Sequence, residues 1–301
     1  MIASWDGIEE FVAVCEAGSF TGAAATFGAS VTHMSRSVAR LETRLQVQLL
    51  HRTTRSLRLT ETGQYFFERC QRLVEDRKET FAAILAESEP QGHLRITCSY
   101  ALGERFVAPM VRHLMAERPA LSVTIDLDNG VRDLIRDGFD LAIRTGHLPD
   151  SRLIARRIAF REVVTLASPA YLDTRGRPRT VAELAGHDCI LGSASSWHFG
   201  GGKKFQPKGR WRCNSGASVL DAAIAGLGIC QIPAFYLGTS VKNGLIEPIL
   251  QDFAPEDEPI WAVYPQQRHL SPKVALVVDH LQENLQAALE RRETRGPVTG
   301  G

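Results

Sequence analysis

The segment from Ser19 to Gly63 constrains the fold more than any other part of the chain, because it holds two short helical patterns separated by a glycine. The first pattern covers 21–27, where Ser19 or Thr21 can cap the helix start and Gly28 can end it. Ser30 is placed to cap a second helix over 31–45. Apolar residues recur there every three or four positions, namely Val31, Met34, Val38, Leu41 and Leu45. This order predicts a helix-turn-helix.

The polar face of the second helix is basic and favours DNA as the partner. Between Ser30 and Thr60 there are six arginines and a single acid, Glu42. In helix-turn-helix proteins the second helix enters the major groove, and arginines and hydroxyl groups contact phosphates and base edges. We predict DNA contacts from Ser30, Thr32, His33, Ser35, Arg36 and Arg40 on the helix, and from Arg52, Thr54 and Arg55 in a β-wing after it. An ordinary helical pair with a solvated basic face is the alternative.

A first helix containing Phe11 precedes this pair, and Phe20 and Phe27 are expected to complete the small core. After the wing, 64–88 contains no proline or glycine and predicts one long helix. Its apolar residues at seven-residue spacing predict pairing with a second copy, and packing on its own domain is the alternative. This seam is Phe67, Val74 and Phe81, with Cys70, Arg77 and Ile84 between them.

The sequence Glu89-Pro90-Gln91-Gly92 breaks the long helix and marks the clearest domain boundary. Strands then alternate with helices, which predicts an α/β fold with a parallel, doubly wound sheet. Strands are expected over 93–99, 121–127, 139–144, 163–167, 189–192, 229–232, 245–250 and 259–264. Helices are expected over 104–118, 131–137, 169–172, 180–185, 217–225 and 234–240, and in a last amphipathic helix that begins at Ser271-Pro272. Residues after about Arg291 are expected to be disordered.

We therefore predict three parts of the chain. They are a helix-turn-helix domain over 1–63, a linker helix over 64–89 and an α/β domain over 90–301. The α/β domain is expected to contain two doubly wound subdomains, the first formed by 92–160 and 267–291 and the second by 161–266.

Composition and missing motifs exclude several other classes of function. The net charge is only +1, so the basic character is confined to the helix-turn-helix. No secretory signal or apolar run of membrane-spanning length is seen, which indicates a cytoplasmic protein without membrane contact. The six cysteines form no CxxC pair and the histidines do not cluster, so we expect no metal and no cofactor. Neither a phosphate-binding glycine loop nor a GxSxG motif is present, and we expect no enzymatic activity.

Ligands of open α/β sheets bind beyond the carboxyl ends of the strands. Applied here, this rule predicts a small effector, an aromatic or acidic metabolite, at Ser99, Tyr100, Ala101, Arg144, Thr145, Ser195, Trp197 and Pro233. Three alternatives remain open: Ser99 can cap a helix, Arg144 can pair with an acid and Trp197 can be a core residue. Cys98 adjoins this region, so a thiol redox sensor is conceivable, although reactivity requires an exposed thiol with a lowered pKa.

Several motifs resemble LysR-type transcriptional regulators. In the N-terminal half they are Ala17-Gly18-Ser19-Phe20, Ala23-Ala24, Ser35-Arg36, Leu41-Glu42, Leu49-Leu50, Arg52-Thr53 and Leu59-Thr60-Glu61-Thr62-Gly63. In the C-terminal half they include Gly138-Phe139-Asp140-Leu141-Ala142-Ile143-Arg144, Ala167-Ser168-Pro169-Ala170-Tyr171-Leu172, His187-Asp188-Cys189 and Ala225-Gly226-Leu227-Gly228-Ile229. The family's pattern is not followed at Val31-Thr32-His33-Met34 or at Gly22, which leaves the base preference open.

The resemblance implies a winged helix-turn-helix on double-stranded DNA, a linker helix that forms a homodimer, and a periplasmic-binding-protein-like domain with an effector between its subdomains. It also implies assembly to a homotetramer, with RNA polymerase as a further candidate partner. The competing hypothesis is a solute-binding-like sensor or thiol sensor in the cytoplasm that reads no specific operator.

Overall fold

The computed structural model describes residues 4–52, 57–84, 90–130, 132–146, 153–266 and 270–292. The chain forms two compact units, Met1–Glu89 and Pro90–Gly301. No helix in the described ranges is long and apolar enough to cross a membrane.

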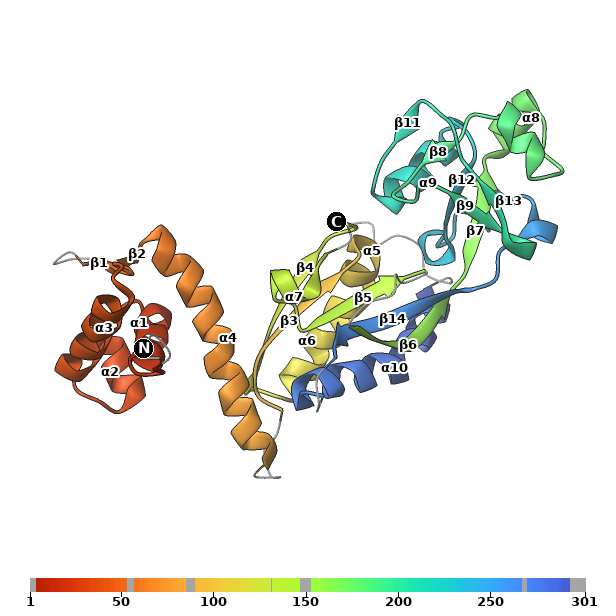
Figure 1. Cartoon of the computed structure of the whole chain (residues 1–301). Helices are drawn as coiled ribbons and strands as arrows, with labels where there is room; N and C mark the ends of the chain where they lie inside the picture. Colours follow the sequence, from red (N-terminus) through yellow and green to blue (C-terminus); the bar gives the residue numbers. More distant parts are fainter. Residues whose placement is uncertain are drawn as a thin grey trace. The chain divides into compact units, whose positions relative to one another are not determined.

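The N-terminal unit is a three-helix cluster followed by a hairpin and a long helix (Figure 1). Its elements are α1 (Ile8–Ala17), α2 (Phe20–Phe27), α3 (Val31–Leu45), β1 (Leu50–Arg52), β2 (Leu57–Leu59) and α4 (Glu61–Ile84). The Ser19 side chain accepts a hydrogen bond from the Gly22 N–H, and the Ser30 side chain accepts one from the His33 N–H. Gly28 ends α2 with a φ of 72°, in the left-handed region that glycine tolerates. The predicted helix-turn-helix is therefore confirmed down to its caps.

The core of this unit is formed by all four helices. Phe11 and Met34 are fully buried, as are Val38 and Leu41 from the predicted stripe. The prediction of burial is wrong for two residues, since Val31 is 43% exposed and Phe27 is 40% exposed. Both lie at the helix ends that flank the exposed Gly28 turn.

The first half of α4 packs on its own unit. This agrees with the alternative that the apolar seam covers its own domain and does not pair with a second copy. Cys70 and Val74 are 2% and 5% exposed, and Phe67 is half-buried against the same core, whereas Phe81 is 59% exposed. Arg77 forms an ion pair with Glu9 of α1. The Ile84 side chain and residues 85–88, at the predicted end of the seam, lie outside the described residues.

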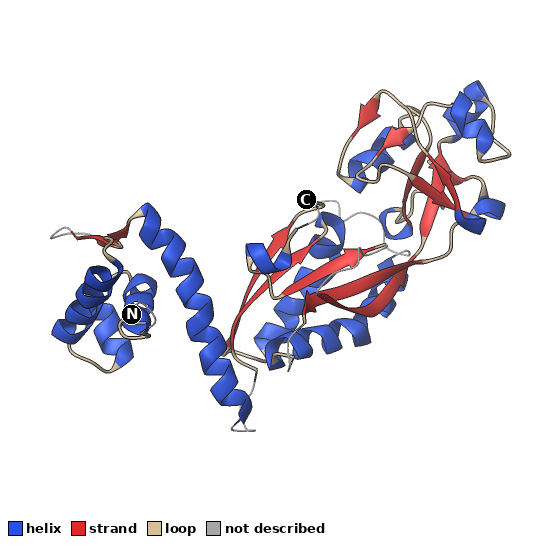
Figure 2. Cartoon of the chain, in the orientation of Figure 1, coloured by secondary structure: helices blue, strands red, loops and turns tan. Residues whose placement is uncertain are grey.

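The C-terminal unit contains a five-stranded sheet in the order β4-β3-β5-β14-β6, which we call the sheet of subdomain I (Figure 2). Its strands are β3 (Gly92–Cys98), β4 (Leu121–Leu127), β5 (Leu141–Thr145), β6 (Leu153–Arg161) and β14 (Glu258–Pro265). Strands β3, β4 and β5 are parallel as predicted, but β14 runs antiparallel to both its neighbours. The chain leaves this sheet after β6 and returns to it at β14. Because β14 is antiparallel to its neighbours, it does not need the crossover helix that joins parallel strands. Strand β6 was not predicted as a strand.

Helices cover this sheet. The chain from Tyr100 to Ala116 is one helical run of α5 (Tyr100–Leu102), a π-helical turn (Gly103–Val107) and α6 (Ala108–Ala116). With α10 (Pro272–Arg292) it buries one face, where Phe106, Val277 and Leu281 meet strand residues such as Ile96. The predicted apolar positions of the last helix are all buried. The helix expected over 131–137 is reduced to α7 (Leu134–Asp137). Residues 293–301, predicted to be disordered, lie outside the described residues.

Subdomain II is built around β7 (Val163–Ala167), which lies between β12 (Cys230–Pro233) and β13 (Glu247–Pro248). Both pairings are antiparallel, so the parallel expectation is wrong for this sheet. The remaining elements are α8 (Pro169–Arg175), β8 (Ile190–Leu191), β9 (Trp197–Phe199), β10 (Lys203–Phe205), β11 (Trp211–Arg212) and α9 (Gly216–Ile224). The helices expected over 180–185 and 234–240 are 3₁₀ turns at Ala182–Gly186 and Ala234–Tyr236.

Candidate DNA-binding face and effector cavity

The polar face of α3 presents several of the predicted DNA contacts to solvent. Thr32, Arg36 and Arg40 are exposed, and Ser35 is half-buried. Ser30 is engaged as the helix cap, and His33 Nε2 lies 3.1 Å from Oε1 of Glu10 on α1. Arg52 ends β1, but its side chain lies outside the described residues, as do Thr54 and Arg55.

Glu42 has a structural role that its position in a basic segment concealed. Its Oε1 atom accepts hydrogen bonds from the backbone N–H groups of Leu49, at 2.8 Å, and Leu50, at 3.0 Å. The one acid between Ser30 and Thr60 therefore fastens the start of the wing to α3. Hydrogen bonds that backbone N–H groups donate to a charged acceptor are stronger than those donated to a neutral one.

A second contact holds the other strand of the wing. The Thr60 hydroxyl donates to the Gln48 carbonyl at 2.8 Å and accepts from the Gly63 N–H at 2.8 Å. Thr60 thus caps α4 and closes the hairpin at once, which explains why α4 begins at Glu61, earlier than predicted.

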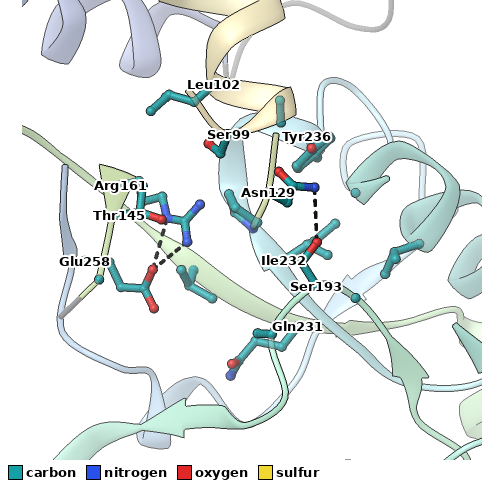
Figure 3. A pocket seen from close by; sticks show the side chains of 18 of the residues that line it. Ser99, Leu102, Asn129, Thr145, Arg161, Ser193, Gln231, Ile232, Tyr236 and Glu258 are labelled. Carbon is teal, nitrogen blue, oxygen red and sulfur yellow. Dashed lines mark hydrogen bonds and ion pairs between the residues drawn. The ribbon is translucent and has the colours of Figure 1, made fainter. Parts of the chain in front are cut away.

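The C-terminal unit holds a cavity of about 360 Å³ between the two subdomains (Figure 3). One wall comes from the carboxyl ends of the subdomain I strands, with Ser99, Ala101, Asn129 and Thr145. The facing wall comes from subdomain II, and Arg161 and Glu258 lie where the two subdomains join. Polar residues of the second wall are Ser193, Ser196, His198, Asn214 and Gln231, and its aromatic residues are Trp197, Phe235 and Tyr236.

The cavity collects five of the eight predicted effector residues: Ser99, Ala101, Thr145, Trp197 and Pro233. Ser195 is exposed and lies outside the lining, whereas its neighbours Ala194 and Ser196 belong to it. Tyr100 is 55% exposed and contributes only its backbone N–H, which donates to Oδ1 of Asn129 at 2.9 Å.

Arg144, the predicted cation of the site, also lies outside the lining. Its Nη1 donates to the Asp128 carbonyl at 2.7 Å and its Nη2 to the Thr97 hydroxyl at 3.0 Å. Burial lowers the pKa of this guanidinium. The side chain therefore holds the loop after β4 against the sheet, through a backbone carbonyl and a hydroxyl and not through the acid side chain that the alternative expected.

Asn129 is a cavity residue that the sequence reasoning missed. Its Nδ2 donates to Oγ of Ser193 at 3.3 Å and to the carbonyl of Asn214 at 3.1 Å, so one carboxamide links the two walls. The signal was available, because Asn129 follows β4 and the rule on carboxyl ends of strands applies equally to that strand.

Cys98, Cys15 and Cys70 have the properties of structural thiols. Cys98 is fully buried, and burial raises its pKa to about 12. Burial likewise raises the pKa of Cys15 to about 12 and that of Cys70 to about 11. Such shifts oppose formation of the thiolate that a redox sensor needs. Within the described residues, no three His, Cys, Asp or Glu side chains are grouped to hold a metal ion.

Comparison with known proteins places both units in one family. Residues 5–64 match the model of the bacterial regulatory helix-turn-helix protein of the lysR family, and residues 87–286 match the LysR substrate binding domain. The HTH-type transcriptional activator AaeR of Escherichia coli K12 is 32% identical over 281 residues, covering 91% of each chain. The regulator CrgA of Neisseria meningitidis is 32% identical over 283 residues, covering 91% of this chain and 95% of CrgA.

Solved structures agree with this assignment. The CrgA structure has a TM-score of 0.56 at 31% identity and covers 93% of this chain and 98% of CrgA. The structure of the full-length Vibrio cholerae virulence activator AphB has a TM-score of 0.56 at 28% identity. The match covers 91% of this chain and 97% of AphB. The fold and the two matched domains define a DNA-binding transcriptional regulator with an effector-binding domain. The chain belongs to the LysR family.

Proposed function

We propose that this regulator binds its effector in the cavity between the subdomains and reads its operator with the exposed face of α3. The observation that carries the first part is the cavity itself, because both subdomains supply polar groups to a single space. A ligand that contacts both walls favours one relative arrangement of the subdomains. It can regulate DNA binding if its affinity differs between the arrangements.

The cavity suits a small organic molecule with an aromatic part and a polar end. A volume of about 360 Å³ falls in the range of small-ligand sites. Tyr236 is a half-buried aromatic residue of the lining, whereas Trp197 and Phe235 line the cavity from core positions, at 2% and 4% exposure. In the first turn of the run Tyr100–Ala116, the Tyr100 N–H is engaged by Asn129, whereas the N–H groups of Ala101 and Leu102, which line the cavity, have no helical partner. These groups favour an acidic or otherwise electron-rich end.

A bulky substitution inside the cavity tests this proposal. We expect Ser193→Trp to abolish thermal stabilisation of the full chain by small aromatic probes, with benzoate, 4-hydroxybenzoate and benzamide as the first panel. Ser195→Trp is the matched control, because Ser195 is exposed nearby but does not line the cavity. Equal ligand responses in the two variants would show that the effector binds elsewhere.

Arg36 tests the operator-reading part. If Arg36 reads a base edge, Arg36→Ala should weaken binding to the operator by about 1–3 kcal/mol and relax specificity at one base pair. Fluorescence anisotropy on the DNA upstream of the gene, titrated with salt, measures both effects. Arg69→Ala on α4 is the control for loss of one positive charge, and Arg55→Ala is expected to weaken all sequences equally. A uniform loss for Arg36→Ala would assign Arg36 to phosphate contact.

The remaining parts of the proposal concern assembly and setting. We propose a cytoplasmic homodimer, assembling to a homotetramer, that acts on double-stranded DNA with RNA polymerase as a partner and has no catalytic step. Tyr65, Leu73 and Phe81 support a dimer, because these large α4 side chains are 63%, 51% and 59% exposed. The division into 1–63, 64–89 and 90–301, with subdomains at 92–160 with 267–291 and at 161–266, belongs to the same proposal.

A further inference from the structure

Arg161 and Glu258 occupy the two points where the chain passes between the subdomains. Arg161 is the last residue of β6, and β7 of the other sheet begins at Val163. Glu258 is the first residue of β14, the strand on which the chain returns. The two residues are direct partners in the β6–β14 ladder.

The ion pair between them uses only part of each side chain. Nε and Nη2 of Arg161 both donate to Oε2 of Glu258, at 3.0 Å and 2.7 Å. Nη1 of Arg161 donates no hydrogen bond to the described part of the chain. The Arg161 side chain is 20% exposed and that of Glu258 is 23% exposed. Figure 3 shows the guanidinium facing the cavity, with the carboxylate on one side of it.

The pair also decides the charge of the cavity. Among the described lining residues, Arg161 is the one arginine or lysine and Glu258 is the one acid. Arg144 cannot take this role, because it does not line the cavity and its Nη1 and Nη2 atoms already donate to the Asp128 carbonyl and the Thr97 hydroxyl. The lining therefore carries one positive charge that a neighbouring negative charge neutralises.

We propose that Arg161 binds the anionic group of the effector through Nη1 and that Glu258 restricts the site to monoanions. This inference deepens the proposed effector site and depends on it. A guanidinium presents donors on more than one edge, so Glu258 can hold Arg161 while a ligand carboxylate binds another edge. A second ligand charge would meet Glu258 without compensation. Because the pair lies at the crossing strands, the ligand contacts the junction whose geometry sets the arrangement of the subdomains.

Removing the negative charge of Glu258 and comparing ligands of different charge gives the sharpest test. In the full chain we expect Glu258→Gln to strengthen benzoate binding about tenfold, equivalent to about 1.4 kcal/mol, and to strengthen terephthalate, a dianion, by more. Binding of neutral benzamide should be unchanged. Isothermal titration calorimetry measures all three ligands. Glu247→Gln is the matched control, because it removes the same charge from another arginine–glutamate pair, with Arg177, that does not line the cavity.

Arg161 variants provide an independent measurement. We expect Arg161→Gln to bind benzoate and benzamide with equal affinity, and Arg161→Lys to restore preference for benzoate. A gain of affinity in Glu258→Gln cannot come from misfolding. If Glu258→Gln does not fold, Arg161→Gln and Arg161→Lys test the proposal in its place. Benzoate and terephthalate affinities unchanged in Glu258→Gln, or discrimination retained in Arg161→Gln, would overturn the proposal. So would the absence of benzoate binding to the wild type.

The outcomes separate this proposal from the effector site itself. If benzamide binds the wild type as tightly as benzoate, and Ser193→Trp abolishes both, the cavity is the effector site but the assignment of Arg161 is wrong. If Ser193→Trp has no effect on a probe that binds, the cavity proposal fails as well.

Discussion

The Glu42→Ala variant is expected to unfold its N-terminal unit more easily than the wild type, by about 2–4 kcal/mol in the free energy of unfolding. The substitution leaves the N–H groups of Leu49 and Leu50 without their acceptor, and both residues are fully buried. Water cannot readily replace the carboxylate there, so the cost is that of two unsatisfied buried donors. Urea unfolding followed by circular dichroism would measure it.

DNA binding should respond together with stability, because the wing is positioned through the same two bonds. Glu42→Gln is the informative control: it keeps an amide oxygen near the two N–H groups and removes only the charge. We expect it to lose about 1 kcal/mol and to retain most operator affinity. An alanine variant as stable as wild type would mean that the wing finds other acceptors.

The second large effect is expected at Gly63, in the first turn of α4. A Cβ atom added there would lie 2.0 Å from the Leu49 carbonyl oxygen and 2.9 Å from its carbon. Because the obstacle is backbone, Gly63→Ala must separate α4 from the wing. We expect a loss of about 3 kcal/mol and a corresponding fall in melting temperature, measured by calorimetry.

Gly22→Ala is the comparison for this variant. Gly22 lies within α2, and the nearest atom to an added Cβ is the Ser19 hydroxyl oxygen, 3.0 Å away at the end of a side chain. Alanine also gains about 1 kcal/mol of helix propensity over glycine. We therefore expect a change within about 1 kcal/mol. A similar loss at both positions would show that backbone contact at Leu49 is not the cause.

Local rules predicted the helix-turn-helix well because its signals lie close together in sequence. Ser30, Gly28 and the stripe from Met34 to Leu41 act over a few residues, and α3 has the predicted bounds. The prediction that Val31 is buried was wrong because periodicity identifies the apolar face of a helix but not where the neighbouring helix stops covering that face. The structural role of Glu42 was not predicted, because its partners, seven and eight residues away, are backbone groups that carry no sequence signature.

The effector cavity was predicted only in part, for a related reason. The carboxyl ends of strands located Ser99 and Thr145 correctly, since parallel strands share one edge. Arg144 follows the same rule but turns into the sheet, toward Thr97. Arg161 and Glu258 were missed because they are 97 positions apart and become neighbours only through the antiparallel entry of β14.

The position of β14 also determines the order in which the protein can be completed during synthesis. This strand lies between β5 and β6, although about a hundred residues of subdomain II are made before it. The first sheet therefore cannot close until the ribosome has produced β14, and its apolar face waits longer still for α10. The DNA-binding unit, by contrast, is finished while the rest of the chain is still being translated. A newly made regulator thus has a folded DNA-binding unit before it has an effector-binding domain that could respond.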